Sequence, residues 1–188
     1  MKMVSVVTGL KLIEEKGYNP GSVDNIRKYE SEFKTVSDHS KHTTAYGFEI
    51  INGEIKSYPL VLLGYGGASL LTETSVITRN SRLYVAIDDF VVALELNSLK
   101  ILWATKVDFS TCFGIFWVEN ISGIISWGEV NVSRLDPDGK IQWSVSGKDI
   151  FSEEFKIEDE YAFATDFEKN QYKIDLISGK IDMVETIK

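Results

Sequence analysis

Short apolar runs alternate with polar residues along most of the chain, and turn residues separate these runs. The segment "SRLYVAIDDFVVALEL" (81–96) is typical, and it predicts two strands that meet at Asp88 and Asp89. Alternation with a period of two indicates a strand with one face toward a core. Turn signals recur about every eight to twelve residues, which is typical of all-β proteins. The pattern therefore predicts an all-β protein built from short antiparallel strands.

One turn recurs in a fixed register along the chain. The four copies are "FEIINGEI" (48–55), "LELNSLKI" (94–101), "RLDPDGKI" (134–141) and "IDLISGKI" (174–181), and their starts are 46, 40 and 40 residues apart. Asn-Gly, Asp-Gly and Ser-Gly in three of them supply the positive φ of tight turns. Leu99 replaces this glycine in the second copy, which predicts a different turn geometry there. A period of about 40 residues with three or four strands each predicts a propeller-like array of about four short antiparallel blades.

The amino-terminal part departs from this pattern. Residues 9–21 ("GLKLIEEKGYNPG") predict a short helix that ends at Gly17, and residues 22–33 predict a second helix capped by Ser22. A polar loop follows at 34–44. We therefore expect two parts, an N-terminal segment (1–43) that packs on a β-propeller-like repeat domain (44–188).

Read across its turn, the second copy is "ALELNSLKILW" (93–103). It resembles the tryptophan-docking repeat of the quinoprotein (PQQ)-type β-propellers, in which Ala, Asp, Gly and Trp stand at spacings of two, four and four. No copy is complete, but the copies together fill every column over residues 44–188. The structural residues of this motif are Ala93, Glu95, Trp103, Gly139, Trp143, Asp175 and Gly179. The resemblance implies that each tryptophan packs against the neighbouring blade.

The resemblance leaves the closure of the blades open. Propellers of this type have more blades than the four for which this chain has room. The alternatives are a small four-bladed ring, an open arc covered by the N-terminal segment, and a ring completed by dimerisation. Enzymes of the family enclose pyrroloquinoline quinone and a calcium ion in a complete ring. With few blades, no adjacent cysteine pair and no export signal, this chain is expected to bind no cofactor.

Charge and cysteine content narrow the class of partner and the compartment. The formal net charge of −8 argues against nucleic-acid binding, which needs a basic surface. An acidic protein suits basic partners or is simply kept soluble by its charge. Cys112 is the only cysteine, lies among aromatic residues, and is expected to be a buried, unreactive thiol. The sequence shows neither a signal peptide nor an apolar run long enough to span a bilayer, so we expect no membrane association and a cytoplasmic location.

The candidate metal and catalytic motifs are incomplete, and we assign no catalytic or metal-binding residue. Asp136–Gly139 begins like a calcium-binding loop, but Gly147 stands where the loop requires glutamate, so a hairpin turn is expected. His39 and His42 share one polar loop with Asp38 but have no third ligand nearby. The glycine-rich segment 63–69 lacks the lysine of a phosphate-binding loop and predicts a bend or bulge.

Two features are candidates for contact with a partner. Acidic residues concentrate at 148–169, either as solvated turns or as one anionic face. Trp127 precedes Gly128 at a predicted strand end, where it would be partly exposed on a rim. The candidate partner-binding residues are Trp127, Glu153, Glu154, Glu158, Asp159 and Glu160.

These observations favour a non-catalytic protein-binding module that contacts a basic protein through an acidic face. Within that class we favour a bacterial immunity-type or accessory regulatory protein. One alternative is an enzyme or small-ligand binder at the propeller mouth that uses Asp88, Asp89 and the histidines. Another is a structural subunit that completes its ring by homo-oligomerisation.

Overall fold

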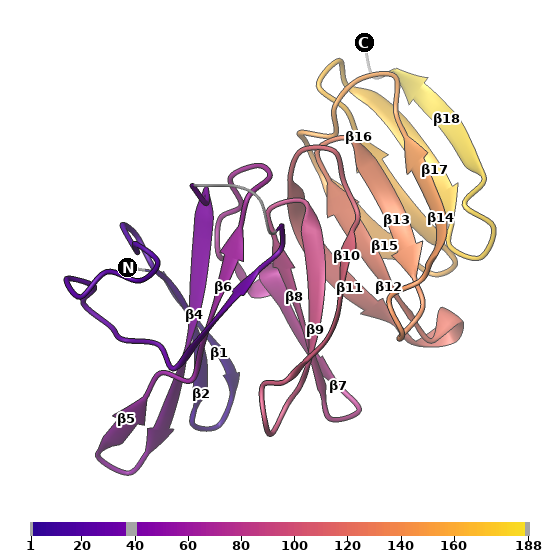
Figure 1. Ribbon diagram of the computed structural model, residues 1–188. Helices are drawn as coiled ribbons and strands as arrows, with labels where there is room; N and C mark the ends of the chain where they lie inside the picture. The colour runs from indigo at the N-terminus through magenta and orange to yellow at the C-terminus, as the bar shows by residue number, and fades with distance from the viewer. Residues whose placement is uncertain (1, 37–40, 187–188) are drawn as a thin grey trace.

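The computed structural model describes residues 2–36 and 41–186 and consists of four sheets arranged side by side as a fan (Figure 1). We call these sheets blades 1 to 4, in chain order. The helical parts of the described residues are two short 3-10 turns, η1 (Glu73–Ser75) and η2 (Glu119–Ile121). The all-β, propeller-like architecture predicted from the sequence is confirmed.

Blade 1 has the order β1-β2-β4-β6-β3, and β5 pairs with the end of β4. Its strands are β1 (Met3–Val7), β2 (Leu10–Glu14), β3 (Ser31–Lys34), β4 (Thr44–Asn52), β5 (Ile55–Ser57) and β6 (Leu60–Gly64). β3 runs parallel to β6, whereas the other pairs of this sheet are antiparallel.

Blades 2 to 4 are each a four-stranded antiparallel meander. Blade 2 consists of β7 (Val76–Arg79), β8 (Arg82–Ile87), β9 (Phe90–Glu95) and β10 (Ile101–Lys106). Blade 3 consists of β11 (Cys112–Val118), β12 (Gly123–Gly128), β13 (Asn131–Leu135) and β14 (Ile141–Ser146). Blade 4 consists of β15 (Phe155–Glu158), β16 (Tyr161–Thr165), β17 (Asn170–Asp175) and β18 (Ile181–Thr186).

The two helices predicted in the N-terminal segment are not formed. Residues 10–14 are strand β2, and residues 17–30 are turns and irregular chain. β2 pairs with β4, which places Leu12 opposite Phe48, and both are fully buried. This pairing outweighs the weak local helix signal. The expected division after residue 43 falls inside blade 1, because β1, β2 and β3 belong to its sheet.

The core lies between the blades. Consecutive residues of the central strands serve opposite interfaces, because side chains alternate across a sheet. Leu83 packs toward blade 1, and its neighbour Tyr84 packs toward blade 3. Ile124 packs toward blade 2, and Ile125 toward blade 4. Burial on both faces explains why these strands are continuous apolar runs.

The repeat tryptophans pack on the turn of the following blade. A Cβ atom added to Gly139 would lie 2.5 Å from the Trp103 ring, and one added to Gly179 would lie 2.6 Å from the Trp143 ring. The indole N–H of Trp103 donates to the Pro137 carbonyl (3.1 Å) in the same turn. The indole of Trp143 donates to the Leu176 carbonyl in blade 4 (3.2 Å). Glycine in these two turns therefore makes room for the ring of the preceding blade.

The turn at Leu99 has the geometry of the glycine turns, so the different geometry expected there is not formed. Leu99 has a φ of 54° and donates its N–H to the Glu95 carbonyl (2.8 Å), as Gly179 does to the Asp175 carbonyl. Ser57 occupies the tryptophan position of blade 1. No indole therefore needs the space, and the Leu99 side chain fills the core there (5% exposed).

In blade 3 the acidic residue of the tryptophan-docking motif is Asp136. The motif spacing, counted back from Gly139, places this residue at position 135, one residue earlier. Leu135 is buried against Ile124, so it faces blade 2. Trp143 of the same blade lies on the opposite face, toward blade 4. The Asp136 N–H donates to the Lys140 carbonyl (3.0 Å), whereas the Asp175 N–H reaches Lys180, one residue farther along. The blade 3 turn is thus one residue shorter, and a one-residue shift moves side chains to the other face.

Candidate functional site

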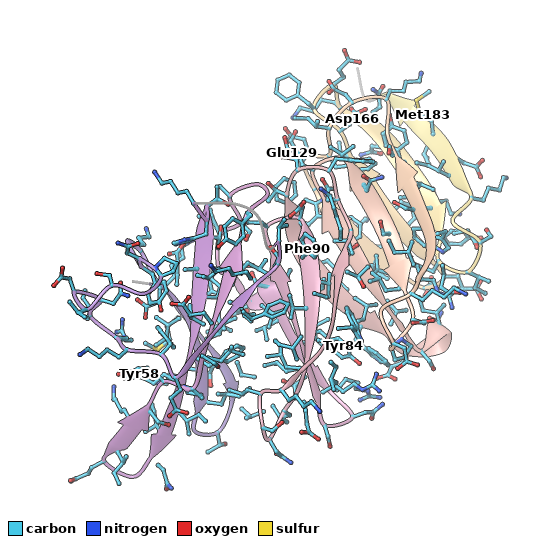
Figure 2. The ribbon with its side chains drawn as sticks, viewed as in Figure 1. Tyr58, Tyr84, Phe90, Glu129, Asp166 and Met183 are labelled. Atoms are coloured by element: carbon cyan, nitrogen blue, oxygen red, sulfur yellow. The ribbon has the colours of Figure 1, made fainter. Side chains whose placement is uncertain are left out.

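The segments that connect successive blades, at 65–75, 107–111 and 147–154, lie at one end of the fan, which we call the connection end. Backbone hydrogen bonds tie them together: Gly67 N–H donates to the Ser110 carbonyl (3.0 Å), and Phe151 N–H donates to the Glu129 carbonyl (2.7 Å). The β12–β13 turn, with Glu129, and the β16–β17 turn, with Asp166, are at this same end (Figure 2). The docking turns lie at the opposite end.

Buried carboxylates fix the chain at the connection end. Asp88 is fully buried, and its carboxylate accepts hydrogen bonds from Thr43 Oγ1 (2.6 Å), from the Thr44 hydroxyl and from the Ser69 N–H (3.2 Å). Asp89 is also buried and pairs with Lys106 Nζ at 2.8 Å. The Asp88 bonds join blade 2 to blade 1 and to the connection between them. The Asp89–Lys106 pair lies within blade 2.

Asp108 and Asp166 hold the other connections in the same way. The Asp108 carboxylate accepts backbone N–H groups of Ser110 (2.7 Å) and Asn131 (2.7 Å), while burial raises its pKa. Burial alone would also raise the pKa of Asp166, but hydrogen bonds from Asn170 and the Tyr172 hydroxyl (2.8 Å) outweigh it and lower that pKa.

The glycines of segment 63–69 are explained by close approach to this carboxylate network. A Cβ atom on Gly64 would lie 2.3 Å from Asp88 Oδ2, and one on Gly66 would lie 2.2 Å from Asp89 Oδ1. Neither glycine has a positive φ. The segment is a bend whose glycines leave space for two buried carboxylates.

An apolar cavity of about 360 Å³ opens at the connection end. Its lining residues are Ala68, Leu70, Thr72, Thr74, Phe113, Trp127 and Ser152. The half-buried Trp127 ring stacks on Phe155 (5.3 Å between centroids) and meets the edge of Phe113 (5.1 Å). Its indole nitrogen has no hydrogen-bond partner among the described residues. Leu70, with 60% of its surface exposed, is the most exposed large apolar side chain of the lining.

The five candidate acidic residues do not form one face. Glu153 and Glu154 precede β15 at the connection end, whereas Glu158, Asp159 and Glu160 form the β15–β16 turn at the opposite end. Glu153 also pairs with Lys169 Nζ at 2.6 Å. Of the predicted binding residues, Trp127 lines the apolar cavity, and Glu153 directly follows the lining residue Ser152 in the chain.

A second cavity, of about 720 Å³, opens between blade 1 and the connection that leads to blade 2, and we call it the interblade cavity. It is lined by residues 14–20, 41–45 and 68–70. Ala68 and Leu70 belong to both cavities, so the two form one continuous depression. The helix expected over residues 9–21 gave no indication of this site, because the strand β2 stands there instead. The period-two pattern at Leu10 and Leu12, which predicts a strand, would have placed Glu14 on the same face.

The described residues contain no cluster of three or more His, Cys, Asp or Glu side chains suited to a metal ion. His42 lies at the interblade cavity, whereas Asp38 and His39 fall outside the described residues. Cys112 is buried, and burial raises the pKa of its thiol to about 12. Asp136–Gly139 forms a hairpin turn. In the part of the chain that the structure describes, no helix is long and apolar enough to cross a membrane.

No protein-family model matches the sequence, and no curated protein does. Solved structures with a similar fold include BamB from Moraxella catarrhalis, with 12% identity, a TM-score of 0.54, and coverage of 96% of this chain and 57% of that one. The computationally designed Ika8 protein has 8% identity, a TM-score of 0.52, and coverage of 78% and 46%. The Neurospora crassa Pan2 WD40 domain has 13% identity, a TM-score of 0.50, and coverage of 61% and 38%.

These likenesses concern the fold. This chain spans between 38% and 57% of the length of the three structures. WD40 and BamB propellers are both among them, and no family match selects the quinoprotein type. The protein is an arc of four β-propeller blades.

Proposed function

We propose that the protein is a non-catalytic protein-binding module that contacts its partner with the connection end. The observation that carries the proposal is the apolar cavity, where Leu70 is 60% exposed beside the Phe113 and Trp127 rings. Apolar and aromatic side chains in a concave site are typical of the central contacts of an interface. Three connections, braced by buried carboxylates, hold this surface rigid, which lowers the entropic cost of binding.

We further propose that the partner is basic. The chain carries a formal net charge of −8, and Glu153 lies next to the cavity-lining Ser152. Complementary charge raises the rate of association and selects among partners. In its most specific form, the proposal is a small cytoplasmic regulator of the bacterial immunity type. Its support is the combination of acidic charge and the apolar cavity.

The Leu70→Ser variant tests the proposed surface. The partner is first obtained by affinity purification from the native host, and its dissociation constant is then measured with both proteins purified. We expect binding about tenfold weaker, because the serine removes an exposed apolar contact at the centre of the surface. Ile177→Ser is the matched control, since Ile177 is also exposed (65%) but lies at the opposite end.

Equal affinity of wild type and Leu70→Ser would contradict the proposed surface, and a purification that recovers no protein would contradict the function itself. The charge of the partner is tested in the same assay. Glu153→Gln should weaken binding more than Glu160→Gln, and high salt should reduce this difference. A partner bound equally well by both variants would not be recognised through Glu153.

A further inference from the structure

The interblade cavity contains a carboxylate oxygen without a hydrogen-bond donor. Glu14 ends β2, its side chain is 10% exposed, and its buried Oε2 accepts no hydrogen bond from the described residues. Its nearest cation, Lys16 Nζ, is 3.8 Å away on a side chain that is 76% exposed. An ion pair that loose and that exposed contributes little, whereas an unpaired buried oxygen is costly. Glu14 Oε2 is therefore a buried acceptor, on a residue that lines the cavity, that the described residues leave without a hydrogen-bond donor.

The neighbouring carboxylate of the cavity already has partners. Glu15 Oε1 accepts hydrogen bonds from the Tyr29 hydroxyl (2.5 Å) and from Arg27 (3.0 Å). Glu15 thus serves to hold the 17–30 segment on blade 1. Glu14 is thus the carboxylate of this lining that lacks a hydrogen-bond donor among the described residues, and the exposed Lys16 and Lys41 also belong to the lining.

The rest of the lining suits a compact cation. The hydroxyls of Thr43 and Thr44 belong to the lining, and although they donate to Asp88, their oxygen lone pairs can still accept a hydrogen bond. Tyr18 and His42 contribute rings whose centroids are 6.4 Å apart, and ring faces attract cations. Burial lowers the pKa of His42, so at neutral pH its ring carries no opposing charge.

We propose that the interblade cavity binds the ammonium group of a lysine side chain from the partner, with Glu14 as its counter-charge. The inference rests on the proposed function and names the chemistry of the partner residue. A lysine ammonium has three donors around one point charge, which suits one free carboxylate oxygen among scattered hydroxyls. Arginine is less suited, because its planar fork requires paired acceptors.

The shared residue Leu70 links this subsite to the apolar cavity. A chain segment that places a lysine in the interblade cavity would pass over Leu70 and bring nearby residues to Phe113 and Trp127. The recognised element is therefore an extended segment with a lysine close in sequence to a large apolar residue.

The probe is a set of synthetic eight-residue peptides that carry one lysine and one phenylalanine, with one to four residues between them. A matched set replaces the lysine by norleucine, which has a similar length and no charge. Binding is measured by isothermal titration calorimetry. We expect at least one lysine peptide to bind, and its norleucine version to bind about tenfold more weakly.

The Glu14→Gln variant keeps the shape of the side chain and removes its charge. It should bind the lysine peptide about tenfold more weakly and no longer distinguish it from the norleucine peptide. Glu54→Gln is the control, because Glu54 is exposed in the β4–β5 turn of the same blade. Thermal melting of both variants verifies that they fold.

Unchanged binding of the lysine peptide by Glu14→Gln would overturn the inference, and so would a wild type that binds no lysine peptide. Spermidine binding without any peptide binding would overturn it as well, since the site would then take a free amine. The proposed function is tested by a separate result. If Leu70→Ser weakens partner binding while Glu14→Gln does not, the binding module is supported and the lysine subsite is contradicted.

Discussion

Gly179 shows how one residue satisfies two constraints at the same time. Its φ of 72° lies in the left-handed region, and its α-carbon faces the Trp143 ring of the preceding blade. Gly139 and Trp103 repeat this relation one blade earlier. Where the tryptophan is missing, the glycine is missing too, as Leu99 shows. The positions of the two residue types are therefore linked across the boundary between blades.

We expect Gly179→Ala to lower the free energy of unfolding by about 3 kcal/mol. Alanine is strained at a left-handed φ, and its Cβ atom would clash with the Trp143 ring. Gly53→Ala separates the two contributions. Gly53 also has a positive φ (63°), but a Cβ atom there meets nothing within 4 Å, so about 1 kcal/mol is expected. Urea denaturation measures both, and equal losses would show that the ring contact contributes nothing.

At the scale of elements, each turn at the connection end has its own polar anchor. Asp166 lies at the start of the β16–β17 turn, is fully buried, and accepts hydrogen bonds from the Asn170 N–H (2.8 Å) and the Tyr172 hydroxyl. The Tyr172 hydroxyl in turn accepts the Lys148 N–H (2.9 Å) of the connection before blade 4. The anchor thus joins a hairpin to the connecting segment.

The lowered pKa of Asp166 makes this anchor sensitive to acid. A carboxyl whose pKa is lower in the folded state stabilises the fold above its unfolded pKa of about 3.9, and this contribution is lost as the pH falls through the folded pKa. We expect Asp166→Asn to be less stable at pH 7 and to lose less stability between pH 5 and about 3. Denaturant titrations across this range measure the free energy of unfolding at each pH.

Asp159→Asn, in the exposed β15–β16 turn, is the control and should behave as wild type. If the free energy of unfolding of Asp166→Asn changed with pH in parallel with that of wild type, the expectation would be contradicted.

The whole molecule is an open arc whose two outer faces are covered in different ways. Residues 17–30 lie over blade 1, where a Cβ atom on Gly47 would meet the Tyr29 hydroxyl oxygen. On the outer face of blade 4, lysine side chains lie over aromatic rings. Lys173 Nζ lies 3.7 Å from the centre of the Tyr161 ring. The single chain is therefore an open arc with a covered first blade and does not close into a four-bladed ring.

We expect the wild-type chain to be monomeric and the double variant Lys156→Ala, Lys173→Ala to self-associate. The lysines shield Phe163 and Tyr161, and their removal leaves an apolar sheet face uncovered. Sedimentation velocity measures the change. Lys180→Ala, at an exposed turn position, is the control and should remain monomeric. A monomeric double variant would show that the face needs no shielding.

The sequence by itself determined the strands of blades 2 to 4, the repeat and the positions of its turns, because period-two patterns and positive-φ dipeptides are local properties. The tertiary structure decided what depends on partners distant in the chain. Residues 10–14 became a strand because β4 pairs with them, and the blade 3 turn shortened because Leu135 had to face blade 2. The two cavities are assembled from connections of different blades around Leu70. No local pattern of residues specifies such a surface, since it forms when separate blades pack together.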